Sequence, residues 1–288
     1  MMPYYGDPEL FRLAVASVRS QQADGWRLTV IDDGYPDPRP GAAVARLGDP
    51  RIRYVRNEQN VGVTASFQRC IELAEAEYMT IAGCDDLLRP NYAKEIAALQ
   101  RQFPEASYIQ PGVEVIDESG ETVRPLADRV KARYRPRITA PAELGGEALA
   151  LSLLRGTWTY FPAISWRTDT LRRYGFRSDL NVAQDLALQI QIIAGGGTLA
   201  LGQTVAYEYR RHGGSVSSLT ATDGTRFIEE AAVLSEAAEI ASSIGWGRAA
   251  RAARNRLSSR MNAATCLPAA LLSRDAASVK SLVHHIVS

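Results

Sequence analysis

Residues 78–90 read YMTIAGCDDLLRP, and this stretch decides the fold class. A short apolar run ends in two adjacent carboxylates, Asp85 and Asp86. Pro90 then stands where a helix can begin, because proline is tolerated in a first helical turn. The pattern predicts a strand over 78–82, a turn, and a helix over 90–103. Taken alone, the two carboxylates have two interpretations: a turn that caps a helix, or a site for a charged ligand.

The same alternation of strands and helices continues on both sides of this stretch. Pro111, inside the last apolar run of the first half, predicts a strand edge or a bulge. Elements that alternate at these lengths predict an α/β fold with a mixed, mainly parallel sheet flanked by helices. In the first half the sequence predicts strands over 27–31, 52–56, 78–82 and 108–116, and helices over 8–22, 63–75 and 90–103.

The second half of the chain is less regular. Residues 117–147 are rich in Pro, Arg and Gly, so they predict a loop region over the sheet. The pattern is helical from 225 to the end, which predicts a main domain over 1–220 and a helical C-terminal extension over 221–288. In the second half of the main domain we expect helices at 148–154, 168–174 and within 181–194, a strand at 162–166, and one or two strands in 198–209.

Composition excludes several classes of protein. The formal charge of +1 over 288 residues provides no global field to attract nucleic acid or a membrane surface. The three cysteines, Cys70, Cys84 and Cys266, are far apart and form no CxxC, so a disulfide framework and a zinc site are both disfavoured. No apolar run approaches the roughly 20 residues of a membrane span. We therefore expect a cytoplasmic protein that binds no nucleic acid.

Polar clusters close three of the predicted strands: Pro3-Tyr4-Tyr5, Asp32-Asp33-Gly34 and Asp85-Asp86. Ligands of parallel α/β sheets bind at the carboxyl ends of the strands. Adjacent carboxylates repel each other unless a cation or hydrogen-bond donors compensate their charge. Two Asp pairs at strand ends therefore favour a site for a divalent cation, Mg²⁺ or Mn²⁺, that bridges to a diphosphate.

These features, in this order, resemble the family 2 glycosyltransferases. The resemblance covers residues 1 to about 220. It implies a GT-A (Rossmann-like) fold, in which residues 1–220 are the catalytic domain. The motifs that carry it are Pro3-Tyr4-Tyr5, Asp32-Asp33-Gly34, Arg53–Asn57, Asn60-Val61-Gly62, Asp85–Leu88, Trp166-Arg167, Tyr174–Phe176, Gln184–Leu186 and Tyr209–His212 with Ser215 and Ser217.

The resemblance also implies an activity. An inverting, metal-assisted reaction would move a sugar from a UDP-, GDP- or dTDP-sugar donor to an acceptor hydroxyl. The acceptor would be a sugar, a lipid-linked molecule or a small molecule. The pathway would be bacterial polysaccharide or glycoconjugate biosynthesis.

Roles follow for the residues that match the family's motifs. The resemblance implies that Asp185 is the catalytic base, which takes the proton of the acceptor hydroxyl. Asp85 matches the last carboxylate of the family's Asp-x-Asp metal motif, whose first position is Gly83 here. His212 completes the metal site or meets the diphosphate. The residues implied to hold the nucleotide are Pro3, Tyr5, Asp32, Asp33, Asn60, Gly62 and Cys84. The candidates for diphosphate contact or support are Asp86, Gln184, Arg210 and Arg211.

Each assignment has a structural alternative. Asp185 is also a helix N-terminal carboxylate that the dipole stabilises, and Asn60–Gly62 is also an ordinary turn before a helix. His212, Arg210 and Arg211 are also solvated surface groups.

Two other functions stay open. One is a non-catalytic nucleotide-sugar-binding relative, suggested by Gly83 and by Gly6, which replaces the family's Asn. The other is a nucleotidyltransferase of similar fold. A nicotinamide-dependent oxidoreductase is disfavoured, because no GxGxxG follows a first strand.

The chain ends provide two further expectations. Residues 1–8 resemble the end of a strand and its loop, so we expect the family's first strand to be missing and the true start to lie upstream. The C-terminal helices carry many basic residues, which form either a solvated face or a peripheral contact with the inner face of an anionic membrane. From residue 248 onward these are Arg248, Arg251, Arg254, Arg256, Arg260, Arg274 and Lys280, against Asp275 alone.

Overall fold

Three parallel strands form the N-terminal sheet of the computed structural model, which describes residues 1–213, 225–272 and 276–287. They are β1 (Met2–Tyr4), β2 (Leu28–Asp32) and β3 (Ile52–Arg56), in the order β1-β2-β3. The sequence analysis expected the end of a strand in residues 1–8, and β1 is three residues long. Tyr4 pairs with Asp32. The polar residues that follow β1 and β2 therefore lie at the same edge of the sheet.

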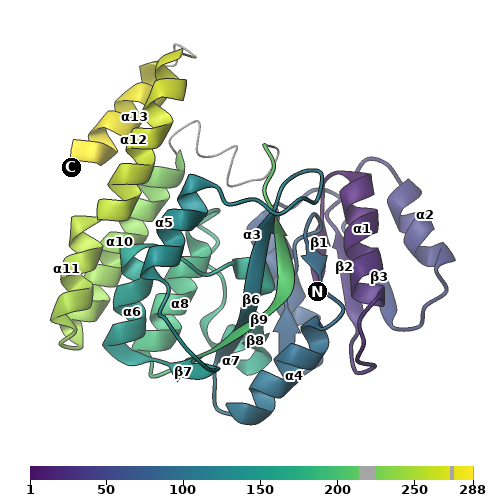
Figure 1. Cartoon of the computed structure of the whole chain (residues 1–288). Helices are drawn as coiled ribbons and strands as arrows, with labels where there is room; N and C mark the ends of the chain where they lie inside the picture. Colours follow the sequence, from purple (N-terminus) through teal and green to yellow (C-terminus); the bar gives the residue numbers. More distant parts are fainter. Residues whose placement is uncertain (214–224, 273–275, 288) are drawn as a thin grey trace.

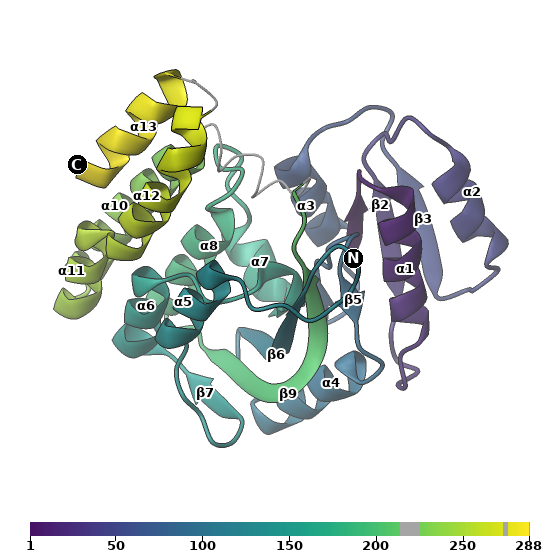
Figure 2. The ribbon, with the colours of Figure 1, turned by 45° about the horizontal axis from the view of Figure 1, so that its top comes forward.

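A second, larger sheet has the order β4-β8-β6-β9-β5. Its β6 and β9 are parallel and its other pairs are antiparallel. The register of β6 shifts on both sides of Gly112, so the bulge predicted from Pro111 is confirmed, and the edge position is wrong because β6 lies between β8 and β9. The strands are β4 (Tyr78–Thr80), β5 (Leu87–Leu88), β6 (Tyr108–Ile116), β8 (Ser165–Arg167) and the strongly curved β9 (Leu199–Arg210), with β7 (Ala142–Leu144) paired to β9 (Figure 2).

The first residue of the chain joins the two sheets. The amino group of Met1 donates to the carbonyl of Thr80 at 2.8 Å, and the N–H of Ala82 donates to the carbonyl of Met1 at 3.0 Å. β1 therefore lies between β2 and the segment that leads into Asp85.

Helices cover both sheets, and α1 and α2 lie on the side of the molecule away from the C-terminal helices (Figure 1). α1 begins at Pro8 because the Asp7 side chain accepts the N–H groups of Glu9 and Leu10. The helices before residue 213 are α1 (Pro8–Arg19), α2 (Arg39–Arg46), α3 (Val63–Glu72), α4 (Tyr92–Gln102), α5 (Leu126–Tyr134), α6 (Gly146–Arg155), α7 (Thr168–Tyr174) and α8 (Gln184–Ala194), with a 3₁₀ turn at Phe161–Ala163.

Most of the predicted elements are confirmed, with shifts of a few residues at their ends. The loop predicted over 117–147 is wrong in part, because this region contains α5, β7 and the first two residues of α6. The buried residue of α5 is a carboxylate, Asp128, so the helix has no apolar periodicity by which its sequence reveals it. The short elements α2 and β5 were also not expected.

The helical C-terminal region is confirmed, and it packs in two parts. Helices α10 and α11 share one core with α6 and α8, through residues such as Leu234 and Ala249. Helices α12 and α13 pack around a smaller cluster with Phe227, Ala263 and Leu282. None of the helices in the described ranges is long and apolar enough to cross a membrane. The four helices are α10 (Thr225–Ser243), α11 (Gly247–Asn255), α12 (Leu257–Leu272) and α13 (Ala276–Val287).

Three details of the sequence analysis lie outside the described residues. They are Ser215 and Ser217 of the resemblance, the domain boundary placed between residues 220 and 221, and Arg274 of the basic C-terminal region.

Candidate functional site

Asp32, the first carboxylate of the pair after β2, is fully buried and bound to groups of its own sheet. Its Oδ1 accepts the N–H of Tyr35 at 2.7 Å. Its Oδ2 accepts the hydroxyl of Tyr54 at 2.6 Å and lies 3.3 Å from a guanidinium nitrogen of Arg56. Asp32 therefore fixes the chain after β2 and the end of β3.

Asp33 holds the segment that leads into α3. Its Oδ1 accepts the side-chain amide of Asn57 at 2.7 Å and the N–H of Val61 at 2.9 Å, and its Oδ2 accepts the N–H of Gly62 at 2.9 Å. Gly62 has φ 88°, which favours glycine, and Asn60 also accepts its N–H at 3.0 Å. A carboxylate accepts about four hydrogen bonds, and within the residues that the structure describes three donors reach Asp33, which leaves one acceptor position at Oδ2.

An aromatic surface lies beside this pair. Tyr5 is 53% exposed, and its ring meets the ring of Tyr35 edge-on at 5.6 Å between centroids. Pro3 is part of β1. A Cβ at Gly6 would lie 3.6 Å from Sγ of Cys84, so the turn after Tyr5 contacts the acidic turn. Burial raises the pKa of Cys84 to about 12, so its side chain is a thiol.

The second Asp pair is divided between the interior and the surface. Asp86 is 1% exposed, and it accepts the Tyr207 hydroxyl at 2.9 Å and the N–H of Arg210 at 2.7 Å. Burial, and next the charge of Asp85, raise the pKa of Asp86 well above its ordinary value. The side chain of Asp85 is 29% exposed, and its Oδ2 lies 2.7 Å from Nε2 of His212. Asp86 therefore supports the turn, while Asp85 faces outward.

Gly83, at the first position of the Asp-x-Asp match, lies under both carboxylates. A Cβ there would come 2.5 Å from Oδ2 of Asp86 and 2.7 Å from Oδ1 of Asp85. In this conformation of the turn, the space for a side chain at residue 83 is occupied by the two carboxylates.

Arg210 is buried, with 3% exposure, so the interpretation as a solvated surface charge is wrong for it. Its guanidinium donates to the carbonyls of Asp85 at 2.7 Å, Asp117 at 2.8 Å and Glu118 at 3.1 Å. Arg210 thus ties the acidic turn to the turn after β6.

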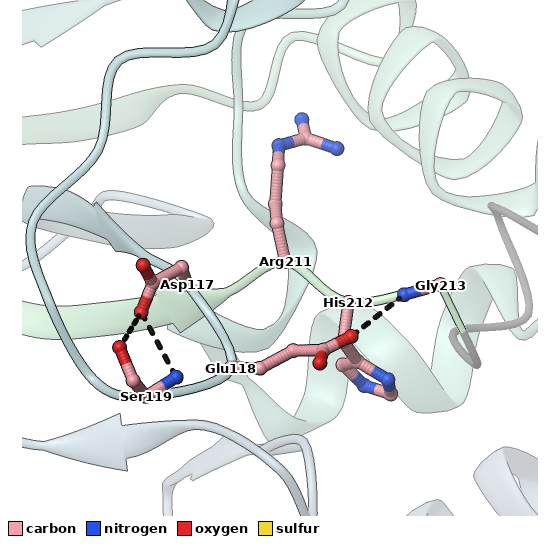
Figure 3. Close-up of a pocket in the computed structure, with 6 residues that line it drawn as sticks. All are labelled: Asp117, Glu118, Ser119, Arg211, His212 and Gly213. Atoms are coloured by element: carbon pink, nitrogen blue, oxygen red, sulfur yellow. Dashed lines mark hydrogen bonds between the residues drawn. The ribbon is translucent and has the colours of Figure 1, made fainter.

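A cavity of about 550 Å³ opens where β9 ends. Figure 3 shows that the consecutive side chains of Arg211 and His212 leave the chain in opposite directions. The N–H of Gly213 donates to Glu118 at 3.4 Å across the cavity (Figure 3). The residues that line the cavity are Asp117, Glu118, Ser119, Arg211, His212 and Gly213.

Arg211 pairs with a carboxylate of α5. Its guanidinium donates to both oxygens of Asp128, at 2.6 and 2.8 Å, and Asp128 also accepts the Tyr160 hydroxyl at 2.9 Å. Asp128 is 7% exposed. This bidentate pair anchors α5 over the end of β9. It also shows that Arg211 is not a simple solvated charge.

Asp185 lies in the first turn of α8, where its carboxylate accepts the N–H of Leu186 at 2.8 Å. The preceding Gln184 is buried and donates to the carbonyl of Asn181 at 3.3 Å. Burial raises the pKa of Asp185, and the charges of Lys131 and Arg226 partly offset this effect. Asp185 is thus a helix N-terminal carboxylate with a raised pKa, and a raised pKa suits a general base.

Sequence reasoning missed three residues around Asp185, namely Glu229, Arg226 and Lys131, and it missed Asp128, which lies on the same helix as Lys131. The carboxylate of Glu229, in α10, accepts the N–H groups of residues 181 and 182 at 2.9 Å each, and so fixes the turn before α8. Arg226 also belongs to α10, and Asp128 and Lys131 belong to α5. The i,i+3 spacing of Asp128 and Lys131 puts them on one side of a helix. Because α5 was not predicted, that spacing carried no signal.

Asp85 and His212 are residue types that can ligate a divalent metal ion, and in this structure they bond to each other. A carboxylate oxygen and an imidazole nitrogen face each other at 2.7 Å, both side chains are partly exposed, and His212 lines the cavity. Mg²⁺ keeps few protein ligands and takes the rest from phosphate and water. No group of three His, Cys, Asp or Glu side chains suited to a metal exists within the residues that the structure describes.

The chain is similar in sequence to a known protein family and to one of its curated relatives. The sequence model of the family described as Glycosyl transferase family 2 matches residues 1–153. The succinoglycan biosynthesis protein ExoO of Rhizobium meliloti (strain 1021) is 24% identical over 221 residues, which are 76% of this chain and 62% of ExoO. The match thus spans less than two thirds of that relative.

Solved structures share the fold. S. aureus TarS 1-349 in complex with UDP-GlcNAc superposes with a TM-score of 0.63 and 13% identity, covering 99% of this chain and 89% of that one. The complex of TarS 1-349 with UDP has a TM-score of 0.57 and 14% identity, and covers 83% of this chain and 69% of that one. At this identity the likeness shows the fold alone.

Proposed function

The chain belongs to glycosyl transferase family 2, and from this premise we propose that it catalyses an inverting transfer of a sugar from a nucleoside-diphosphate-sugar to an acceptor hydroxyl. One observation carries the proposal. Asp85 and His212 are 127 residues apart in sequence and meet at 2.7 Å beside a cavity at the end of β9. The residue before His212, Arg211, pairs with Asp128 of the α5 helix, and the charge of Lys131 on the same helix acts on Asp185.

The nucleotide would bind at the carboxyl ends of β1 and β2. The exposed ring of Tyr5 offers an apolar face for the base, and the remaining acceptor position of Asp33 suits a base N–H or a ribose hydroxyl. Asp32 would act indirectly, because it positions Tyr35 behind Tyr5. Asn60, Gly62 and Cys84 would shape the walls of this pocket.

Asp85 and His212 would hold Mg²⁺ or Mn²⁺ against the diphosphate. When bound, the metal ion neutralises the charge that develops on the leaving nucleoside diphosphate. Asp86 and Arg210 would keep the acidic turn in place through their buried hydrogen bonds. Gln184 would support the turn before Asp185.

Asp185 would take the proton of the acceptor hydroxyl as its oxygen attacks the anomeric carbon. The attack comes from the face opposite the diphosphate, so the configuration inverts. Burial raises the pKa of Asp185, which makes it a better base than a solvated carboxylate, and Lys131 and Arg226 keep it ionised. Burial lowers the pKa of Lys131 itself to about 8, so this support weakens above that pH.

The test is Asp185→Asn. We expect the transfer rate to fall about 10²–10⁴-fold, the range for loss of a general base, while titration calorimetry shows unchanged nucleotide binding. Asp179→Asn is the matched control, because Asp179 is exposed and pairs with Arg177. Full activity of Asp185→Asn would show that Asp185 is not the general base. A wild-type protein that binds the donor but transfers no sugar would be a non-catalytic relative.

The pH profile tests the same assignment. The wild-type rate should fall as the pH drops through the raised pKa of Asp185, because the protonated acid accepts no proton. Lys131→Met removes a positive charge that lowers this pKa, so the acidic limb should move to higher pH. A limb that stays in place, or moves to lower pH, contradicts the role of Asp185.

The donor and the acceptor follow from the relatives. TarS has been crystallised with UDP and with UDP-GlcNAc, and the name of ExoO refers to succinoglycan biosynthesis. We therefore expect a UDP-sugar donor and a polysaccharide or glycoconjugate acceptor. Thermal shifts with UDP-, GDP- and dTDP-sugars, each with and without Mn²⁺, would test the donor. The cytoplasmic location stays a prediction.

A further inference from the structure

Helix α12 presents an apolar stripe to solvent. Leu257, Met261, Pro268 and Leu272 are separated by four, seven and four residues, so they share one face of the helix, and we call them the α12 stripe. Leu257 is 62% exposed, Met261 54% and Leu272 85%. The other side of α12 packs on α13 around Ala263.

The exposed apolar side chains of the described residues concentrate on α12 and α13, which pack on each other and which we call the α12–α13 hairpin. Of the eleven large hydrophobic residues that are exposed, six lie between 257 and 287, on α12 and α13. A contiguous exposed apolar surface usually marks an interaction site. The six residues are Leu257, Met261, Leu271, Leu272, Val283 and Val287.

The same region is strongly basic. Residues 247–288 contain seven Lys or Arg and one Asp, hence +6, and since the whole chain carries +1, residues 1–246 carry −5. Arg248, Arg251 and Arg254 recur every three residues along α11 and are exposed, and Lys280 is exposed on α13. α11 and α12 follow one another along one side of the molecule in both views (Figures 1 and 2).

We propose that helices α11–α13 dock on the surface of an anionic lipid membrane. The α12 stripe enters the boundary between headgroups and acyl chains, and the α11 arginines and Lys280 meet the lipid phosphates. Charge decides between a membrane and a second copy of the chain, because two faces that both carry the exposed α11 arginines and Lys280 repel each other, whereas an anionic bilayer attracts either one. The contact is peripheral and does not depend on the transfer reaction.

The experiment is co-sedimentation of the full chain with vesicles of phosphatidylcholine alone or with 30% phosphatidylglycerol. We expect binding to the anionic vesicles, little binding to the neutral ones, and weaker binding at 0.5 M NaCl. The triple variant Leu257→Gln, Met261→Gln, Leu272→Gln should bind at least about tenfold more weakly, since apolar burial is lost. The double variant Arg248→Gln, Arg251→Gln should bind about 25-fold more weakly, at about fivefold for each arginine near the surface.

Leu126→Gln is the matched control, because Leu126 is 65% exposed and belongs to α5 rather than to α11–α13. It should bind vesicles as wild type does. Thermal melting checks that each variant folds, and the arginine variant tests the proposal even if the apolar variant unfolds. Wild type that stays in the supernatant with anionic vesicles at low salt overturns the proposal. So does a dimer, measured by light scattering, that the triple variant dissociates while vesicle binding persists.

Discussion

The two Asp-Asp pairs of this chain have the same sequence and opposite uses. Asp32 and Asp33 are both buried, and protein groups occupy both oxygens of each carboxylate. In the second pair only Asp86 is buried, while Asp85 stays 29% exposed and faces His212. We therefore propose that the first pair mainly shapes the walls of the site, with one acceptor position left at Asp33, and that the second pair keeps Asp85 for a ligand.

The two pairs differ because their hydrogen-bond donors come from different parts of the chain. Asp32 and Asp33 receive hydrogen bonds from groups 3 to 29 residues further along the chain, on β3 and on the segment before α3. The partners of Asp85 and Asp86 lie 121 to 127 residues away, at the end of β9. The two Asp-Asp pairs thus differ in burial and in hydrogen-bond partners, because the end of the distant strand β9 contacts only the second pair.

The comparison predicts that Asp33 matters for stability more than Asp85 does. Asp33→Ala should lower the free energy of unfolding by about 3 kcal/mol, because three donors lose their acceptor. Asp85→Ala should lower it by less than about 1 kcal/mol, as for an exposed ion pair. Urea denaturation in the presence of EDTA measures both. Equal losses would erase the distinction between the pairs.

For activity the order should reverse. Asp85→Asn should lower the transfer rate about hundredfold, since even the outer-shell partners of metal ligands cost 10–100-fold. The rate should no longer rise with added Mn²⁺. Steady-state assays over a range of Mn²⁺ concentrations measure this, with the exposed residue Asp24→Asn as the control. An unchanged Mn²⁺ response would assign the metal to other residues.

Gly83→Ala tests how closely the second pair is packed. A Cβ at this position would meet both carboxylates at 2.5 and 2.7 Å, so the turn must shift, at a cost of about 2 kcal/mol in unfolding free energy. Gly25→Ala is the control, because a Cβ there meets nothing within 4 Å. If the two variants melt alike, the turn is softer than its geometry indicates.

The smallest effect is expected at Tyr54. Tyr54→Phe removes the hydroxyl that donates to Asp32 at 2.6 Å, and it should cost about 1 kcal/mol of unfolding free energy. Tyr5→Phe should leave stability unchanged, because Tyr5 is 53% exposed. Chemical denaturation separates the two. A neutral Tyr54→Phe would mean that Arg56 and the N–H of Tyr35 satisfy Asp32 by themselves.

Regular elements with a clear apolar pattern were predictable from sequence. The strands over 52–56 and 108–116 and the helix over 168–174 have the predicted bounds. Helix α5 was missed because its buried residue is Asp128, whose partners Arg211 and Tyr160 come from other elements. The α12 stripe was missed for the opposite reason: the helix is apolar on its buried and its exposed sides, so periodicity does not reveal which side solvent meets.

By itself the sequence determined the α/β alternation, the family resemblance and the short list of acidic residues, because strand and helix periods and turn residues are local properties of the chain. Only the tertiary structure decided which of these acids stays available to a ligand. That choice depends on donors more than a hundred residues away: β9 brings Arg210 and His212 to the acidic turn. α10 likewise brings Glu229 to the turn before Asp185. Burial and pairing are properties of contacts between elements, so no single stretch of sequence contains them.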